Sequence, residues 1–516
     1  MTFLVHRFNQ IPRWVIALVV SLAPIVATLF LVRFYLNANL LNFAPVHWND
    51  QTWYWHQTLS FSKVGFASGY YVINEAVAPL AFFRFSSAGP LFPVIFGALG
   101  HLIGWGWLTG ITFNMLMLAA ATLIFIYLAQ LDKLQMILTG FVLLVCGPVL
   151  LYIPTNSQES FHQAGAIIMA GVFYRLWQGK TSSRLWWSGL IFLLVMSLIR
   201  FSFVILLPPY FLISNHKPSL RRVIIAFVVG GVLASGVYML VSLISSPGHN
   251  AIIGHLNSFG TSPLAALQDL YKVLIENLND SFIGASAIDI LTVDHVQGIQ
   301  IAIIVISALV VMFPARNLRS QLSTKPLEAS FHIYNLGVIA LLSIFLYLAD
   351  GFYRVFGIHV LLSILLLIAF RRLATVNILI IVSLLTFGTF TVRYKELIEP
   401  NVTEDRQALE NDRQKWSTWI SYQPDSDAWC NTILFPISLL DSHVLLVPAG
   451  MGITFYSDLK PSVQQPIHSK YLFLDQMALD GLNRYQEAVH IEPIATTNGG
   501  TIYHNLDADC PPPKPP

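Results

Sequence analysis

Long apolar stretches separated by short polar segments dominate the first 392 residues of the chain. Several of these stretches reach about 20 residues, the length that an α-helix needs to cross a bilayer. Since backbone polar groups inside a bilayer must be hydrogen-bonded to one another, such stretches predict helices. We predict eleven spans, at roughly 14–36, 110–130, 134–153, 161–178, 185–199, 201–214, 223–244, 299–315, 329–348, 354–370 and 374–392.

The polar segments between the spans differ in length. Two of them are long, at 37–109 and 245–298, and the second contains an expected amphipathic helix near Leu264–Leu278. Pro93–Trp107 is apolar but short and bounded by proline, so we predict a juxtamembrane helix there instead of a span. A break at Arg200 separates two short spans.

Charge alternates along the chain. His6, Arg7 and Arg13 precede the first span. With the N-terminus inside, every inner loop is basic, as the positive-inside rule requires, and the acids gather in the outer loops. We therefore predict a multi-pass protein with its N-terminus inside and its C-terminus outside, in a membrane such as the bacterial inner membrane.

Composition agrees with this class. Hydrophobic residues make up 55% of the chain and charged residues only 11%, against about 25% charged residues in a soluble globular chain. The net charge of +2 is too small to indicate nucleic-acid binding. The first apolar run is too long for a cleaved signal peptide, so we interpret it as a retained anchor.

Beyond residue 392 the hydropathy falls. The tail at 393–510 begins with a charged helical stretch, Glu404–Lys415, and continues with short apolar runs at Val444–Pro448, Tyr471–Asp475 and Ala488–Ile491 and a turn at 497–500. This pattern predicts a small extracytoplasmic α/β domain, followed by a proline-rich tail at 511–516. The fold class is thus an all-α polytopic membrane protein with about eleven transmembrane helices and an α/β domain.

The three cysteines have different settings. Cys146 lies in an apolar span, where a buried thiol is inert. Cys430 and Cys510 both fall in the outer domain, and an oxidising compartment favours disulfides. We expect these two to pair, although two free thiols are the alternative.

Candidate chemistry lies at the outer ends of the spans. Asp50 stands among aromatic residues just after the first span. The other outer-face candidates are Glu75, Glu159, Arg200, Asp350 and Arg354. Ionisable residues at membrane depth are costly, so they usually face a cavity and have a partner.

These residue types suit the transfer of a sugar from a phosphate leaving group. A carboxylate can take the proton of the acceptor hydroxyl, and arginine binds phosphate as a forked donor. Each residue also has a structural alternative. Asp50 can belong to an interfacial aromatic belt, Glu159 can cap a helix, and Arg200 and Arg354 can reach lipid headgroups.

Together the motifs resemble the GT-C superfamily of integral-membrane glycosyltransferases, which use polyprenyl-phosphate sugars. The resemblance covers residues 14–392. Asp50 in the first outer loop, Glu159 as a second acid, and the short motifs Gly89–Pro93, Leu198–Phe201 and Phe352–Arg354 carry it.

The resemblance implies that Asp50 is the base and that Arg200 or Arg354 holds the donor phosphate. Glu75 and Glu159 would orient the acceptor or bind a divalent cation such as Mg²⁺ or Mn²⁺. Asp350 is a further candidate for substrate binding. Gly89, Phe201 and Glu159 depart from the residues common in the family, so the subfamily and any metal stay open.

The expected function is the transfer of a sugar from a polyprenyl-phosphate donor to a glycan, lipid or protein acceptor on the outer face. Membrane lipids are expected as further partners. A flippase for a lipid-linked saccharide is one alternative, and a polysaccharide polymerase or ligase is another. Charge placement favours the transferase, because the ionisable residues gather at the outer ends and not at the midplane of several spans.

Overall fold

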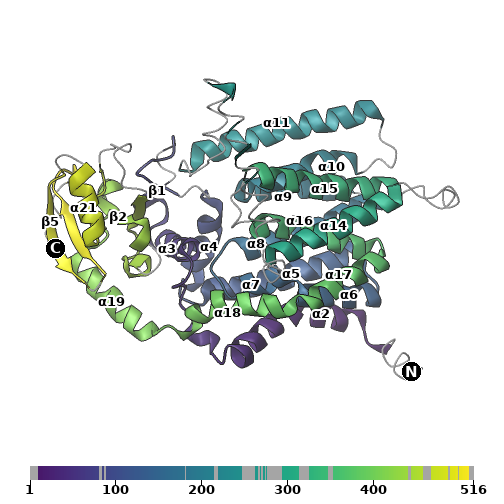
Figure 1. Cartoon of the computed structure of the whole chain (residues 1–516), viewed down its shortest axis with the longest axis horizontal. Helices are drawn as coiled ribbons and strands as arrows, with labels where there is room; N and C mark the ends of the chain where they lie inside the picture. Colours follow the sequence, from purple (N-terminus) through teal and green to yellow (C-terminus); the bar gives the residue numbers. More distant parts are fainter. Residues whose placement is uncertain are drawn as a thin grey trace.

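The computed structural model of the chain describes residues 10–80, 84–85, 89–179, 182–213, 219–246, 262–264, 268, 271–272, 275, 293–312, 325–346, 352–439, 443–456, 467–485, 489–497 and 499–510. Helices form one body of the molecule and a sheet domain adjoins one end of it (Figure 1). The helical body comprises α2 (Arg13–Phe30), α5 (Thr109–Ala129), α6 (Lys133–Val145), α7 (Gly147–Tyr152), α8 (Glu159–Trp177), α9 (Ser183–Ile199), α10 (Leu207–Leu212), α11 (Leu220–Ile244), α14 (Val293–Met312), α15 (Lys325–Leu346), α16 (Phe352–Ala369), α17 (Leu373–Leu385) and α18 (Phe387–Thr403).

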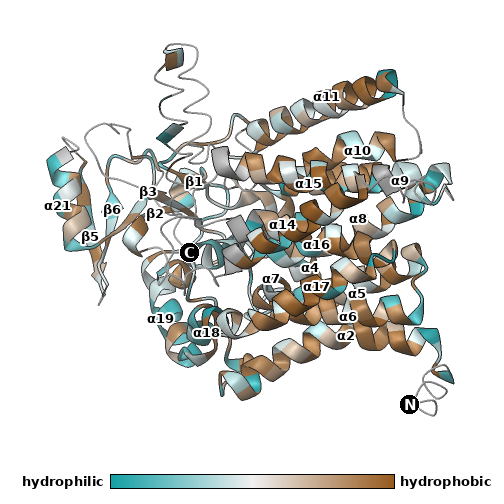
Figure 2. Ribbon diagram, turned by 45° about the vertical axis from the view of Figure 1, so that its right-hand side comes forward, coloured by the Kyte–Doolittle hydropathy of each residue, from teal (hydrophilic) through white to brown (hydrophobic). Residues whose placement is uncertain are grey.

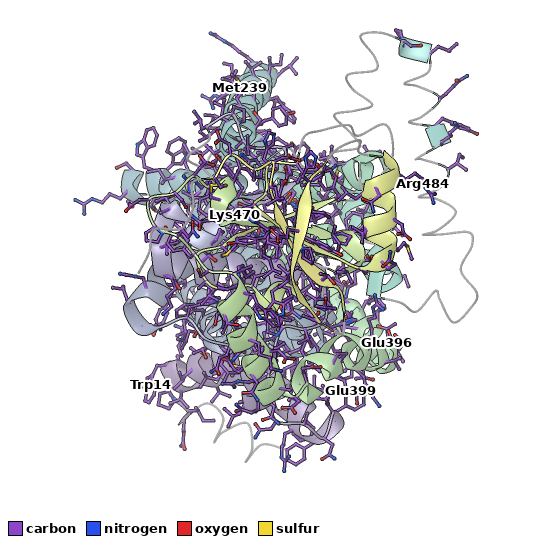
Figure 3. All side chains as sticks on the ribbon, turned by 90° about the vertical axis from the view of Figure 1, so that its left-hand side faces the viewer. Trp14, Met239, Glu396, Glu399, Lys470 and Arg484 are labelled. Carbon is purple, nitrogen blue, oxygen red and sulfur yellow. A yellow bond between two sulfur atoms is a disulfide. The ribbon has the colours of Figure 1, made fainter. Side chains whose placement is uncertain are left out.

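The helices of this body consist largely of hydrophobic residues (Figure 2). Trp14 on α2 and Met239 on α11 are 63% and 64% exposed, and they lie at opposite edges of the molecule (Figure 3). Helices that are apolar on their exposed faces suit a lipid environment. The interior is formed largely by α8 and α16, whose side chains are almost all buried.

The predicted number of spans is not confirmed. Among the described residues, three helices are long and apolar enough to cross a membrane: Arg13–Tyr35, Thr109–Ala129 and Leu220–Ile244. The bent pair α17 and α18 would form a fourth. The remaining apolar helices are shorter, and most of the predicted helix at Leu264–Leu278 lies outside the described residues.

Two predicted spans are interrupted. The span at 134–153 is divided at Cys146 into α6 and α7, because Pro148 lacks a backbone N–H and starts a new helix. The span at 374–392 bends by 55° at Thr386 and then continues to Thr403, well beyond the predicted end. The predicted break at Arg200 is confirmed, since this residue is extended between α9 and a 3₁₀ turn, Phe201–Leu206.

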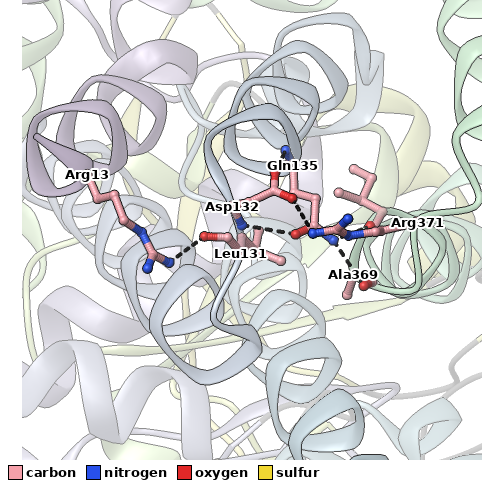
Figure 4. A network of polar contacts seen from close by, with 7 residues as sticks. Arg13, Leu131, Asp132, Gln135, Ala369 and Arg371 are labelled. Carbon is pink, nitrogen blue, oxygen red and sulfur yellow. Dashed lines mark hydrogen bonds and ion pairs between the residues drawn. The ribbon is translucent and has the colours of Figure 1, made fainter. Parts of the chain in front are cut away.

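The end of the body away from the sheet is fixed by polar contacts between turns (Figure 4). Asp132 caps α6 and forms an ion pair of 2.6 Å with Arg371. Gln135 donates to the main-chain oxygens of Ile368 and Ala369, and Arg13 donates to that of Leu131. The start of α2 therefore lies beside the turns before α6 and α17. This basic end matches the predicted inner face, although its orientation in a membrane stays a prediction.

The first outer segment forms two helices. α3 (Asn49–Val64) follows a short 3₁₀ turn, and α4 (Leu91–Ile103) packs beside α3. Close packing needs glycine, because a Cβ at Gly97 would lie 2.7 Å from the Phe61 ring. The apolar segment Pro93–Trp107 thus forms a short helix against α3, in agreement with the juxtamembrane helix that the sequence predicts.

The sheet domain has a mixed six-stranded sheet in the order β1-β3-β2-β4-β6-β5. Its strands are β1 (Tyr71–Ile73), β2 (Thr432–Pro436), β3 (Gly452–Tyr456), β4 (Tyr471–Leu474), β5 (Ile491–Thr496) and β6 (Thr501–Asn505). The first four in spatial order are parallel, and β6 and β5 continue the sheet antiparallel. β1 comes from the first outer segment, so the sheet joins residues far apart in the chain.

Helices cover both faces of this sheet. Trp53 of α3 and Trp416 of α19 (Arg406–Trp419) pack on one face, and Leu482 of α21 (Gln476–Tyr485) packs on the other. β2, β3 and β4 are buried throughout, as expected for parallel strands covered on both sides.

The strand predictions are partly right. β4 and the turn at 497–500 lie where the sequence places them. The apolar run Val444–Pro448 is not a strand, because it forms a 3₁₀ turn, Val444–Leu446, ahead of Pro448 and packs beside α19. The Cys430–Cys510 disulfide is present, so the predicted pairing is confirmed, and Cys146 is buried as expected.

Candidate functional site

Three of the predicted residues meet at the end of the helical body next to the sheet. Arg354, in the first turn of α16, pairs with Asp50 of α3 at 2.5 Å and with Glu159 of α8 at 2.7 Å. Each carboxylate stands in the first turn of its helix, where the helix dipole favours negative charge. One guanidinium therefore joins three helices that are distant in sequence.

The two carboxylates differ in their access to solvent. The side chain of Glu159 is 3% exposed and that of Asp50 is 38% exposed. A buried charge must be paired, because an unpaired one carries a large desolvation cost. Glu159 thus holds Arg354 from the interior, whereas Asp50 stands at the accessible end of the arrangement and can reach a substrate.

Aromatic side chains surround this ion-paired group. The Arg354 guanidinium lies 5.7 Å from the ring centroid of Trp48, and the Tyr152 ring stacks on Trp48 with its centroid at 5.6 Å. Tyr54, one turn after Asp50, is partly buried, and loss of solvent around its hydroxyl raises the pKa of that group, with the negative charge of Asp50 adding to the effect. The Tyr54 hydroxyl is therefore neutral at ordinary pH.

Arg200 is placed differently from Arg354. In the described part of the chain it forms no ion pair, and its buried Nε has no hydrogen-bond partner. Its charge acts on Tyr54 and on His162, which is one turn along α8 from Glu159. Arg200 is therefore a cation near the Asp50 group that no described carboxylate neutralises.

A buried polar segment leads into α8 and supports the position of Glu159. Residues 155–160, which lead into α8, are all buried, and Asn114 of α5 donates to the main-chain oxygens of Tyr152, Ile153 and Thr155. Several buried atoms of this segment have no hydrogen-bond partner among the described residues, including both amide atoms of Asn156 and the second carboxylate oxygen of Glu159. Unpaired buried polar atoms are uncommon in folded proteins and indicate a place where polar groups are bound.

Glu75 lies in another environment. It follows β1, and its carboxylate accepts from the main-chain N–H groups of His468 and Ser469 and from the Ser469 hydroxyl at 2.6 Å. These partners belong to the segment before β4, so the structure joins Glu75 to the sheet domain and not to Arg354. The remaining predicted residue, Asp350, lies outside the described residues.

The expected divalent cation has no ready set of ligands here. The described residues contain no group of three or more His, Cys, Asp or Glu side chains that could hold a metal ion. Asp50 and Glu159 direct their oxygens at Arg354 instead. We therefore assign the two carboxylates to the Arg354 guanidinium.

Sequence reasoning missed the residues that support the site, among them Trp48, Gln51, Asn114 and Asn401. Asn114 is detectable as a polar residue within an apolar span. Asn401 belongs to the sequence Asn-Val-Thr, which resembles a glycosylation site. In the structure its side chain is fully buried and hydrogen-bonded to His47 and Gln51, so it is not accessible for modification.

Comparisons with known proteins find similarity in structure alone. No family model matches the sequence, and no curated protein matches it. The chain is similar to a solved oligosaccharyltransferase of Archaeoglobus fulgidus, described in complex with Zn and sulfate, at 12% identity and a TM-score of 0.46 over 94% of this chain and 73% of the other. It is also similar to ArnT of Cupriavidus metallidurans bound to undecaprenyl phosphate, at 12% identity and a TM-score of 0.40 over 96% of this chain and 98% of the other.

Proposed function

We propose that the chain is a membrane glycosyltransferase that moves a sugar from a polyprenyl-phosphate carrier to an acceptor hydroxyl or amide at the outer face. The observation that supports this most is the grouping of Asp50, Glu159 and Arg354 near Arg200, which forms no ion pair with any described residue. An accessible carboxylate and a cation that no described carboxylate neutralises are the two charges that the reaction needs.

The proposed mechanism assigns one role to each residue. For a hydroxyl acceptor, Asp50 takes the proton as the acceptor oxygen bonds to the anomeric carbon of the sugar. The bond between that carbon and the phosphate oxygen breaks, and the electron pair leaves with the lipid phosphate. Arg200 stabilises this phosphate by charge-assisted hydrogen bonds. Attack opposite the leaving group inverts the anomeric carbon.

Arg354 and Glu159 prepare Asp50 for this step. Arg354 is already shared by two carboxylates, so it is a weaker phosphate ligand than Arg200 and a better support for Asp50. The aromatic face of Trp48 lies against the same guanidinium. We expect the transferred sugar to pass close to Asp50, with the lipid phosphate on the side of Arg200.

An assay with purified protein tests the base. Polyprenyl-phosphate hexoses and pentoses are supplied with an extract of envelope glycans, lipids and proteins, and labelled product is measured. Asp50→Asn keeps the size of the side chain and removes the basic oxygen, so we expect transfer to fall by about 100-fold or more. Asp412→Asn is the control, because Asp412 is an exposed carboxylate of α19 that pairs with Lys415 and lies in a different helix from Asp50. Near-normal turnover of Asp50→Asn would show that Asp50 is not the base.

A flippase for a lipid-linked saccharide is the second candidate. Buried polar residues inside the helical body favour it, namely His332 and Asn335 of α15 and His359 of α16. Reconstituted vesicles separate the two functions. A flippase moves labelled lipid-linked sugar across the bilayer in the Asp50→Asn variant as well as in the parent, whereas the proposed transferase forms a new glycosidic bond that the variant fails to form.

A polymerase or ligase with its catalytic residues in one late loop fits less well, because the residues of this site come from α3, α8 and α16.

A further inference from the structure

Two buried amide side chains meet directly behind Asp50. The Gln51 amide nitrogen donates to the Oδ1 atom of Asn401 at 2.8 Å, although 350 positions separate these residues in sequence. Both side chains are fully buried. Asn401 lies near the end of α18, so this contact joins the last helix of the body to the first turn of α3.

The same amides hold the chain on both sides of a strained residue. Trp48 has a φ of +87°, a conformation that bulky side chains rarely adopt. The N–H of His47 donates to Asn401 Oδ1 at 3.0 Å, and the Gln51 amide nitrogen also donates to the His47 carbonyl at 2.5 Å. Asn401 further accepts from the Ala44 N–H through its main-chain oxygen at 2.8 Å. These contacts hold the turn at Trp48, from which α3 begins.

Gln51 also reaches the segment that carries Glu159. Its Oε1 atom accepts from the N–H of Asn156 at 3.2 Å, three residues before Glu159. A single side chain thus contacts the turn before Asp50, the end of α18 and the entry to α8. Arg354 can form both ion pairs only while Asp50 and Glu159 keep their relative position, and this position depends on the Gln51 side chain.

We propose that Gln51 and Asn401 are positioning residues, an amide clamp that holds the Trp48 turn so that Asp50 stays at the accessible end of the ion-paired group. The clamp touches no substrate. The expected effect of the clamp on kcat rests on the proposed glycosyl transfer, whereas its expected effect on the conformation of the Trp48 turn does not. Small displacements of a catalytic group cost rate more than binding, because reaction needs closer alignment than association does.

Two shape-preserving substitutions remove the clamp: Gln51→Met and Asn401→Leu. In the transfer assay we expect kcat to fall by roughly 10- to 100-fold, with the KM for the polyprenyl-phosphate sugar within about twofold of the parent. The acid limb of the pH–rate profile should move, because Asp50 loses its fixed distance to Arg354. The double variant should lose no more than the worse single variant, since both changes break one unit.

Gln135→Met is the matched control. Gln135 is also a buried glutamine whose amide joins two helices, but it lies at the opposite end of the body, where it donates to Ile368 and Ala369 (Figure 4). It should change thermal stability to a similar extent and leave the pH–rate profile in place. A shift of that profile in Gln135→Met as large as in Gln51→Met would overturn the proposal, because the effect would then be general loosening.

Hydrogen exchange measured by mass spectrometry tests the clamp without any activity. Amides in peptides covering residues 44–53 should exchange about tenfold faster or more in Asn401→Leu than in the parent, because local opening becomes easier. Unchanged exchange there overturns the clamp even if activity falls. If the parent transfers no sugar from any supplied donor, the proposed function fails, and the exchange result still decides the clamp.

Discussion

Glu75 provides a test of how a buried carboxylate joins the turn after β1 to the segment before β4 within the sheet domain. It is 6% exposed, and burial raises its pKa from an ordinary 4.5 to about 7, although the N–H and O–H groups of residues 468 and 469 oppose the shift. Tyr456 lies near enough for the Glu75 charge to raise the pKa of its hydroxyl, so it supplies no positive charge that would offset burial. Between pH 4.5 and pH 7 the folded state therefore holds a proton at Glu75 that the unfolded chain has largely lost.

The sign and size of the effect on stability follow from this shift. Below pH 4.5 the carboxyl is protonated in both states and contributes no pH dependence. As the pH rises from about 4.5 to about 7, the unfolded chain releases its proton first, so the free energy of unfolding falls. One pKa unit corresponds to about 1.4 kcal/mol, which gives a loss of about 3 kcal/mol across this window.

The substitution Glu75→Gln should remove this dependence, because glutamine resembles the protonated carboxyl. We expect the parent and the variant to have similar stability near pH 4.5 and the parent to become less stable than the variant, by about 3 kcal/mol, near pH 7. The measurement is denaturant unfolding in detergent across this range, followed by the fluorescence of the sheet-domain tryptophans. Glu492→Gln is the control, since Glu492 is exposed on β5 of the same sheet.

A difference between parent and Glu75→Gln that stays constant from pH 4.5 to pH 7 would refute the burial argument. A parent that gains stability over the variant as the pH rises would refute it more strongly, because the hydrogen bonds to the carboxylate would then outweigh burial. The same variant separates two roles for Glu75. A role in joining these two segments of the sheet domain changes stability and leaves the KM for donor unchanged, whereas the substrate-binding role expected from the sequence raises the KM.

Three further predictions concern the site, the orientation and the disulfide. Arg200→Ala should raise the KM for polyprenyl-phosphate sugar at least about tenfold, with partial recovery in Arg200→Lys, because a forked phosphate ligand is lost; an unchanged KM would place the phosphate elsewhere. In a variant with Cys146 replaced, a cysteine at Ser417 should react with an impermeant maleimide from outside and a cysteine at Ser182 should not, and the reverse pattern would invert the predicted orientation. Reduction of Cys430–Cys510, which closes 80 residues, should lower the unfolding free energy of the sheet domain by up to about 4 kcal/mol, and identical unfolding curves with and without reductant would contradict this.

The main parts of the site were predictable because each charged residue stands at the end of an apolar stretch. Asp50, Glu159 and Arg354 could each be found in this way, since a charge at the edge of a membrane helix is costly and needs a reason. Their mutual contact was not predictable from position alone. This contact depends on the packing of α3, α8 and α16, and short sequence motifs contain no information on the distances between helices.

Other features could not be predicted, for physical reasons that differ. The pairing of Tyr71 in β1 with Ile453 in β3 joins residues separated by most of the chain, and a three-residue strand has too little periodicity to identify its partner. The bend at Thr386 follows from side chains that bond to the preceding turn, since Ser383 and Thr386 donate to main-chain oxygens four residues earlier. The clamp between Gln51 and Asn401 joins two amides that the sequence presents as ordinary polar residues.

The sheet domain contributes to the support of Asp50 through α3. Trp53 packs into the sheet core beside Tyr71 and Phe455. One turn later His56 donates from Nε2 to the Val447 carbonyl at 2.9 Å and accepts at Nδ1 from the Tyr71 hydroxyl at 2.8 Å. Burial lowers the pKa of His56 to about 3, so the ring is neutral and this tautomer is maintained at any pH near neutrality. Because α3 also carries Asp50, the domain holds the helix from one side while the clamp at Asn401 holds its first turn from the other. A tail that only recognised acceptor would not need to bury Trp53 and His56, so we infer that the sheet is part of the framework of the site.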